Sequence, residues 1–462
     1  MIKKSYFFLW NLYALLILYK KVHHKILTPM KITWKIPVIG IAAAASMWAG
    51  IESSKLLKEE GLHHSTQGCV FRTTMGEESS EGHAIYKTPE NVEKSVKKGL
   101  AFLINAQQNN GGWGAGLHSR QDVTDPHAVS TDPATTSMVL MSILRSGNTF
   151  EKGDYKNQAL KALNYLLECV EKSSPNDLNI TTQTGTQIQS KLGQNIDVSL
   201  TAQALSNSLD YLDYDKKLKE RVKKNLDVCT EKIQKSQNQD GSVRGAGWAG
   251  VLQSSFATNA LESAQKKGAK VDEKALQRAR DYNKGNFNTK TGDVNTDMGA
   301  GIVLYSVSGS TRSSAKEARE AEEKMEKARK DGKLAANAPV STENLKKAGF
   351  GDQEAERYSN AYQVYSQAKV KAQDDRVMSG FGNNGGEEFL SFLQTGESLI
   401  IGKDKEWKKW YNNVSGRLLN IQENDGSWRG HHCITSPVFC TATCLLILSV
   451  ENDVQKLEEL GK

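Results

Sequence analysis

Two kinds of helical segment alternate along the chain between about residues 90 and 450. One kind is amphipathic: apolar residues such as Leu160, Leu163 and Leu167 recur at helical spacing, with Lys156 and Lys161 elsewhere on the wheel. Segments of this kind span 92–106, 155–172, 216–235, 273–284 and 405–421. The other kind has small and apolar residues on every face and almost no charge, and spans 135–144, 199–209, 254–264, 298–308 and 441–450.

This alternation predicts an all-α fold with two layers of helices. A helix without a charged face has to be covered on all sides, and small residues let its neighbours approach closely. An inner ring of uncharged helices wrapped by an outer ring of amphipathic helices satisfies both kinds. We therefore expect an α/α toroid over residues 90–452, followed by a C-terminal tail at 453–462; an open superhelical stack of helix pairs is the alternative.

Two stretches interrupt the alternation. Residues 311–336 are charged all round, which predicts a solvated helical insertion that projects from the ring. Residues 380–388 (GFGNNGGEE) form a glycine-rich segment. A phosphate-binding loop would need a strand before it and a Lys-Ser/Thr pair after it, so we expect a plain loop.

The first fifty residues have a different character, with apolar stretches at 5–19 and 36–50. Five lysines lie between the two stretches: Lys20, Lys21, Lys25, Lys31 and Lys35. Lysines at this density stay on the cytoplasmic side of a membrane, so residues 1–50 predict a signal or membrane anchor and an exported chain. Translation from Met30 would leave a good secretory signal, and a helical hairpin buried in the fold is the non-membrane alternative. Residues 51–89 are polar and resemble a linker.

Composition and charge narrow the expected partners. The chain of 462 residues has 60 basic and 53 acidic residues and a net charge of +7, but it shows no Arg-rich stripe with interleaved aromatics. Nucleic acid is therefore not an expected partner. The six cysteines contain no CxxC pair and do not suggest a disulfide scaffold.

A Gln-x-x-x-Gly-x-Trp pattern marks the turns between outer and inner segments. It occurs as Gln107 to Trp113 and as Gln422 to Trp428, and a third copy from Gln237 has valine in place of the tryptophan. In such a turn the glutamine can bond open backbone groups at a helix end, the glycine can take a left-handed cap, and the tryptophan can fill the gap between helices.

These turns resemble the repeat of the terpenoid cyclase and protein prenyltransferase toroids, which include the squalene–hopene cyclases. The first copy is the longer match, with Lys98, Gly99, Phe102 and Leu103 in register ahead of the glutamine. The resemblance implies the α/α toroid and an apolar, isoprenoid-like ligand in its central cavity. It does not fix the reaction, because one fold hosts many chemistries.

Squalene-type cyclases carry an Asp-x-Asp-Asp-Thr-Ala box whose middle aspartate protonates an alkene. The nearest match here runs from Asp197 to Ala202, with Ser199 and Leu200 where the acid and its partner should be. If the chain is a diverged cyclase, the resemblance leaves Asp132 or Asp197 as the displaced catalytic acid. The alternative is that both residues cap the N-termini of helices.

The prenyltransferases of this group bind zinc through Asp, Cys and His. Here His431-His432-Cys433, followed by Cys440, precedes the last uncharged segment. A partner ligand would then have to come from Asp132, His127 or Asp297 across the ring. The Asp227-Val-Cys229 triplet falls on an amphipathic segment that faces the wrong way. We therefore predict no metal and no cofactor.

Inner-helix N-termini gather at one end of such a toroid, where aromatic, acidic and histidine side chains suit a ligand pocket. The expected ligand-binding residues are Trp113, His127, Asp297, Trp428 and His432. Three hypotheses for the function remain open. The first is an exported toroid that binds an apolar ligand or a partner, the second is a diverged cyclase or prenyltransferase, and the third is an enzyme that acts on cell-surface glycans. The sequence predicts no oligomeric state.

Overall fold

The computed structural model describes residues 88–382 and 384–461, and all structural statements below concern this part of the chain. The predicted signal or anchor at 1–50 and nearly all of the predicted linker lie outside it. Within the described residues the protein is helical, and β-structure is limited to isolated bridges.

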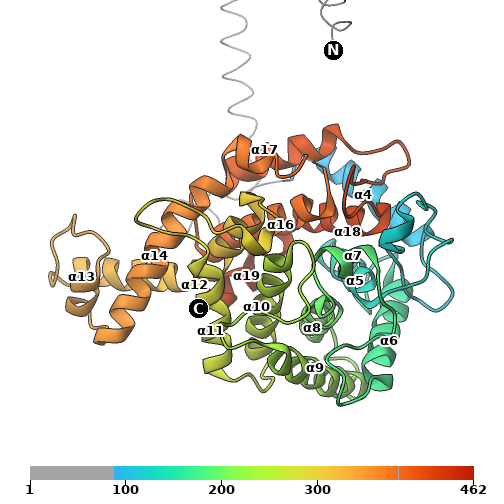
Figure 1. Ribbon diagram of the computed structural model, residues 1–462, viewed down its shortest axis with the longest axis horizontal. Helices are drawn as coiled ribbons and strands as arrows, with labels where there is room; N and C mark the ends of the chain where they lie inside the picture. Colours follow the sequence, from blue (N-terminus) through green and yellow to red (C-terminus); the bar gives the residue numbers. More distant parts are fainter. Residues whose placement is uncertain (1–87, 383, 462) are drawn as a thin grey trace, which may run out of the picture. The chain divides into compact units, whose positions relative to one another are not determined.

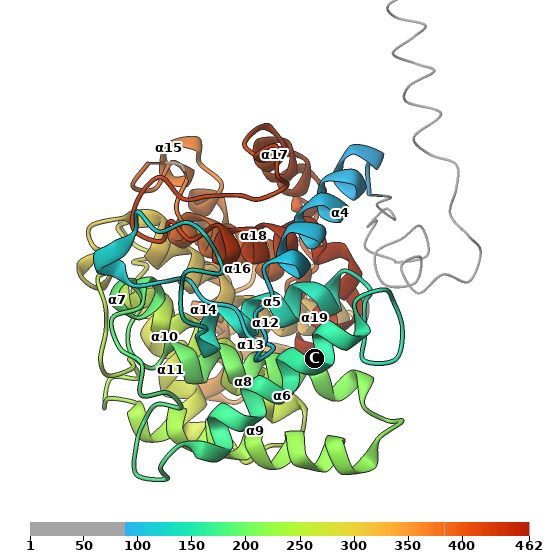
Figure 2. The same cartoon turned by 90° about the vertical axis from the view of Figure 1, so that its right-hand side faces the viewer.

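Six helices form an inner ring. Each packs against the next along the chain, and the last packs against the first, so the ring is closed (Figures 1 and 2). All twelve residues of the last inner helix are buried, as expected for a helix without a charged face. The inner helices are α5 (Pro133–Arg145), α8 (Ile196–Ser208), α10 (Gly250–Lys266), α12 (Val303–Lys330), α16 (Gly386–Ile401) and α18 (Pro437–Leu448).

Six further helices cover the ring from outside. Each buries one stripe, as α9 does with Val222, Leu226, Cys229 and Ile233 at spacings of three and four. The closed contacts confirm the predicted α/α toroid and rule out the open stack for the described residues. The outer helices are α4 (Glu90–Asn105), α6 (Lys156–Lys172), α9 (Lys216–Ser236), α11 (Glu273–Gly285), α14 (Asp352–Ala372) and α17 (Trp407–Asn420).

Shorter elements occupy the connections. They are η1 (His118–Arg120), α7 (Gln187–Lys191), η2 (Leu209–Tyr211), η3 (Asp297–Gly299), α13 (Thr342–Lys347), α15 (Asp375–Met378), η4 (Val450–Asp453) and α19 (Val454–Leu460). No single helix of the described residues is long and apolar enough to cross a membrane, although the bent pair Pro437–Leu448 and Val450–Leu460 passes by length and composition.

The glutamines of the repeated turns join neighbouring outer helices. Gln107 donates through Nε2 to the carbonyl of Gly111 in its own turn at 2.9 Å and to the carbonyl of Gln158 in α6 at 3.0 Å. Gln422 donates in the same way to Gly426 at 2.9 Å and to Ser95 in α4 at 3.0 Å. The last turn therefore bonds the first helix and seals the outer ring.

The two tryptophans of the turns are fully buried packing residues. The indole of Trp113 donates to the carbonyl of Leu103 at 2.7 Å, and that of Trp428 donates to the carbonyl of Leu418 at 2.8 Å. Each donor bonds the last turn of the preceding outer helix, as a buried indole requires.

The structure adds detail to two segments of the second half of the chain. Residues 311–330, part of the stretch 311–336 that was expected to be a solvated projecting helix, continue α12 and bury Ala318, Ala321 and Met325 against α14 (Figure 1). The C-terminal tail at 453–462 is helical: α19 packs against α16, and Asp453 of η4 accepts from Arg145 of α5 at 2.6 Å. The sequence analysis also did not predict α14 and α16.

The glycines of the turns allow close approach between helices. Gly426 has a φ of +90°, and a Cβ added there would meet the backbone oxygen of Lys98 at 2.6 Å. We expect Gly426→Ala to lower the free energy of unfolding by about 2 to 4 kcal/mol, through a left-handed backbone and a clash that helix packing cannot relieve. Gly416→Ala is the matched control: this glycine lies inside α17 with open space around it. The Gly416→Ala variant should raise the free energy of unfolding by about 1 kcal/mol. Denaturant unfolding measures both, and equal effects would contradict the role assigned to Gly426.

Candidate metal centre

The inner helices all begin at the same end of the ring, and the loops before them contact one another there. We call this end the N-terminal face. Ala115 and Gln187 bond across the first two loops at 2.9 Å, and Gln187 accepts from the backbone of Thr435 at 2.7 Å. The amide of Gly386 bonds the carbonyl of Ile434 at 3.1 Å, which joins the last two loops. Side chains that are distant in sequence therefore meet on this face.

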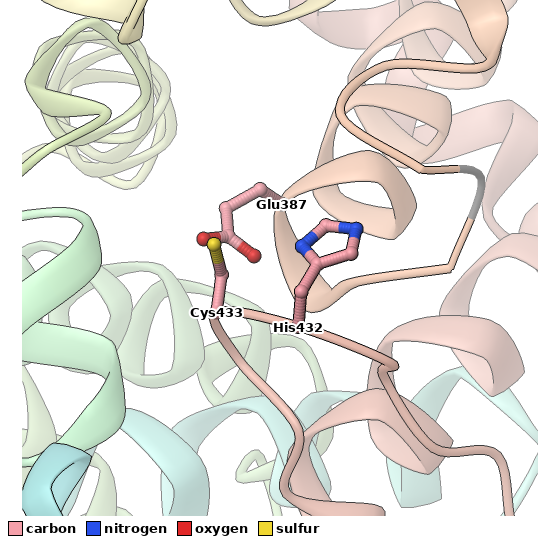
Figure 3. Close-up of side chains that lie close together, drawn as sticks. All are labelled: Glu387, His432 and Cys433. Atoms are coloured by element: carbon pink, nitrogen blue, oxygen red, sulfur yellow. The ribbon is translucent and has the colours of Figure 1, made fainter. Parts of the chain in front are cut away.

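Three metal-ligating side chains converge on the N-terminal face. Glu387 lies in the first turn of α16, and His432 and Cys433 lie in the loop before α18 (Figure 3). Their ligating atoms all lie within 4.8 Å of one another. A tetrahedral zinc ion holds its ligand atoms roughly 3.3 to 3.8 Å apart, so side-chain movements of about an ångström would complete the site.

Several polar atoms at this site lack partners. Both ring nitrogens of His432 and the Oε2 atom of Glu388 are buried and have no hydrogen bond among the described residues. Burying a polar group without a partner is unfavourable, and an unpaired group in a native fold calls for an explanation such as an ion. A bound metal ion explains these unpaired polar atoms better than ordinary core packing does.

Cys433 is held in a special backbone conformation. Its φ is +60°, in the left-handed region that residues other than glycine seldom adopt, and its carbonyl accepts from Gln121 at 2.6 Å. Burial and the nearby Glu387 raise the pKa of the thiol to about 11, although the Lys191 ammonium opposes this rise. A thiol with this pKa is protonated at neutral pH, so the site is not arranged for a free cysteine nucleophile.

Burial also raises the pKa of Glu387, to about 8, with the neighbouring charge of Glu388 as the second cause. A bound cation would favour the ionised forms of both the carboxyl and the thiol, because metal ligands bind deprotonated. The electrostatics therefore match a site that is completed by a positive ion.

A lysine lies beside the three ligands, and exposed apolar side chains lie in the loops of the same face. Lys191 is 4% exposed, and its ammonium lies 4.1 Å from the centroid of the Trp248 ring. Four large apolar side chains are exposed in the loops of this face, and we call them the collar: Leu117, Trp248, Met298 and Phe381.

The predicted catalytic acids lie side by side, away from these ligands. Asp132 caps α5, accepting from the amide of Thr135 at 2.7 Å and from the amide of Ala115 at 2.8 Å. Asp197 accepts from the amide of Ala134 at 3.1 Å and from Gln189 at 2.7 Å. Both are fully buried, and these bonds tie α8 to the start of α5. The bonds of Asp132 are what the capping alternative expects, whereas Asp197 is the second residue of α8 and does not cap that helix.

Burial raises the pKa of Asp132 to about 6, and burial together with the charge of Asp132 raises that of Asp197 to about 7. A raised pKa makes a carboxylic acid a weaker proton donor, which is the opposite of what protonating an alkene needs. The assignment of either residue as a catalytic acid stays a prediction.

The predicted ligand-binding residues are not gathered in one place. Only His432 lies in the cluster. Trp113 and Trp428 are buried between helices, whereas His127 and Asp297 are exposed in loops. The carboxylate that joins His432 and Cys433 in the candidate metal cluster is Glu387, not Asp132 or Asp297. The sequence analysis missed Glu387 because it did not predict α16, although the Gly-Gly-Glu-Glu at its start is a typical first turn.

The centre of the inner ring holds little free volume. A cavity of about 50 Å³ lies between the inner helices and α19, with Arg145, Glu397 and Asp453 among its lining residues. Small-molecule sites usually have about 300 to 1,000 Å³. An isoprenoid-like ligand would therefore have to lie elsewhere, and the collar on the N-terminal face offers apolar surface.

No family model matches the chain, and no curated protein matches it. Among solved structures the chain is similar to the type II terpene cyclase MstE from Scytonema in its ligand-free form, at 12% identity and a TM-score of 0.41, covering 79% of this chain and 98% of that chain. A variant of the same cyclase in complex with its product, merosterolic acid A, gives 13% identity and a TM-score of 0.40, covering 79% and 97%. These likenesses carry no argument about fold or chemistry, and the helix contacts by themselves establish the α/α toroid.

The pKa values of the buried aspartates make stability depend on pH. Because folding raises both values above those of the unfolded chain, their contribution is fully present below about pH 4 and is lost as pH rises through 6 and 7. We expect Asp197→Asn to reduce the fall in unfolding free energy between pH 4.5 and 8 by roughly 2 to 4 kcal/mol. Urea unfolding at the two pH values measures it. The control is Asp272→Asn, which changes an N-cap whose pKa is lowered and should leave the decrease in unfolding free energy between the two pH values as in the wild type. The prediction is contradicted if Asp197→Asn also shows the wild-type decrease.

Proposed function

We propose that the protein is a zinc-dependent lipid-modifying enzyme, of a transferase or hydrolase type, whose site lies on the N-terminal face of the toroid. The observation that carries the proposal is the convergence of Glu387, His432 and Cys433, with ligating atoms within 4.8 Å and unpaired polar atoms beside them. Sulfur, imidazole nitrogen and carboxylate oxygen are the donors that zinc prefers, and three protein ligands leave a fourth position open, as catalytic zinc sites do.

The chain's own residues suggest how a substrate would lie. Bound zinc supplies Lewis acidity toward an oxygen or sulfur of the substrate. Lys191 adds a second positive charge next to Cys433 and would hold a negatively charged group there. The collar would bind an apolar, isoprenoid-like portion, because Trp248 and Phe381 are 68% and 63% exposed. Binding of an apolar ligand without catalysis remains the second candidate, and the collar supports it equally.

We propose further that the toroid acts outside the cytoplasm. Its N-terminal segment would either anchor it to the membrane or be cleaved as a signal. The support is the pair of apolar stretches at 5–19 and 36–50 with five lysines between them, which lie outside the described residues. Protease added to intact cells should cleave the full chain but not a version that lacks residues 1–50. Protection of the full chain until lysis would contradict export.

Metal analysis tests the site directly. We expect the purified chain, loaded with zinc and dialysed, to retain about one equivalent, because three protein ligands are present. Glu387→Gln and Cys433→Ser should each weaken zinc binding at least tenfold, while Cys169→Ser on α6 should not. With cobalt in place of zinc, a thiolate-to-metal charge-transfer band should appear and vanish in Cys433→Ser.

Two results would overturn the metal proposal. One is a wild-type chain that retains no zinc or cobalt after loading. The other is a Cys433→Ser variant that binds as tightly as Cys169→Ser, since the metal would then lie elsewhere. Catalysis is tested separately, by incubating the zinc-loaded protein with apolar esters and thioesters.

A further inference from the structure

The second nitrogen of the His432 ring faces a different carboxylate. Glu388 is fully buried in the first turn of α16, and its Oε2 atom lies 3.7 Å from Nε2 of His432. Figure 3 shows the other ring nitrogen turned toward Glu387. We propose that Glu388 is a positioning residue of the metal centre. Its carboxylate accepts a hydrogen bond from Nε2–H of His432, so that Nδ1 faces the metal. This inference rests on the proposed function.

The Glu388 carboxylate is fixed through one of its two oxygens. Oε1 accepts from the Tyr305 hydroxyl of α12 at 2.5 Å and from the amide of Phe381 at 2.9 Å. Oε2 is buried and has no hydrogen bond among the described residues. The carboxylate is therefore anchored on one side and has a free acceptor on the side that faces His432.

Three glycines before and at the start of α16, Gly380, Gly382 and Gly385, make room for this pair. A Cβ added at Gly385 would meet Oε2 of Glu388 at 2.6 Å and Cε1 of His432 at 2.7 Å. At Gly382 it would meet Nε2 of His432 at 3.2 Å, and at Gly380 it would overlap Oε1 of Glu388. The glycine-rich stretch that was expected to be a plain loop thus provides backbone that closely surrounds one histidine and one carboxylate, and we call it the cradle.

Such an arrangement has a known chemical consequence. A histidine that binds a metal through one nitrogen usually donates the other N–H to a carboxylate, which fixes the tautomer and the orientation of the ring. The distance of 3.7 Å is beyond a hydrogen bond, and a small rotation of the ring toward Glu388 would close it. Glu388 therefore acts on the metal through His432 rather than as a fourth ligand.

The test measures zinc affinity in three variants by competition with a coloured chelator. Glu388→Ala removes the acceptor and should weaken zinc binding by about ten- to a hundredfold. Glu388→Gln keeps an acceptor but loses the charge, so its affinity should lie between those of the alanine variant and the wild type. Glu388→Asp keeps the charge and should partly restore affinity relative to alanine.

A spectroscopic signature separates positioning from a loss of packing. In the zinc-loaded wild type, the Nε2 proton of His432 should exchange slowly with water and give a resolved ¹H–¹⁵N correlation. In Glu388→Ala that correlation should disappear, whereas Glu388→Asp, which keeps the charge, should retain it. The alanine variant also loses the bonds from Tyr305 and Phe381, so its metal-free form should melt at a lower temperature than the wild type. A Glu388→Ala protein that retains both the correlation and wild-type affinity overturns the inference.

The cradle offers a second variant that leaves the carboxylate intact. Gly385 has φ −149° and ψ 160°, a conformation that alanine adopts freely, so Gly385→Ala acts only through its contact with Glu388 and His432. It should weaken zinc binding at least tenfold. Gly285→Ala, at the end of α11 with open space around it, is the control and should not.

The outcomes distinguish this inference from the proposed function. If the wild type binds no zinc, both fail. If the wild type binds zinc and loses it in Cys433→Ser, but Glu388→Ala and Gly385→Ala bind normally, the metal site stands and the positioning role fails. Loss of affinity in Gly385→Ala supports the cradle even if Glu388→Ala is too unstable to purify.

Discussion

Burial of the inner helices, which are poor in charge where they face one another, is the constraint on which the rest of this structure depends. A helix such as α18, with every residue buried, has no face that water can cover, so it needs neighbours on all sides. Packing α18 back against α5 supplies the last of these neighbours and closes the ring. The outer helices then add charged surfaces that face the solvent. The toroid is thus an arrangement in which both kinds of helix bury most of their apolar surface.

Closing the ring in this way also determines where chemistry can occur. Because each inner helix follows an outer helix that runs the other way, the loops before the inner helices meet on one face. Glu387 at the start of α16 and Cys433 in the loop before α18 are brought together only by that convergence. At the centre of the ring, by contrast, Arg145 binds Asp453 and Glu397, and the polar side chains leave little room. Among the described residues, the centre of the ring therefore holds only a small cavity.

Much of the frame could be predicted from the sequence, because helical periodicity and the repeated turns depend on nearby residues. Ten of the twelve ring helices followed from this pattern, while α14 and α16 did not. The α16 segment carries two adjacent glutamates at its start and lacked the clear signature of either helix type. The roles of buried polar residues were harder to predict than the helices. Whether Asp132 caps a helix or serves as an acid depends on the donors around it, and these come from other segments.

The contact between the two ends of the ring has a consequence for how the protein reaches its native state. Gln422 bonds Ser95, and Thr88 donates to Glu451, so the seam joins segments separated by more than three hundred residues. During synthesis the first inner helix has no partner on one side until α18 has emerged. Uncharged helices such as α5 are therefore left uncovered for most of translation, and partly folded chains are prone to stick to one another. Contacts of this sequence separation also slow folding, so completion of the toroid is a late and chaperone-sensitive event.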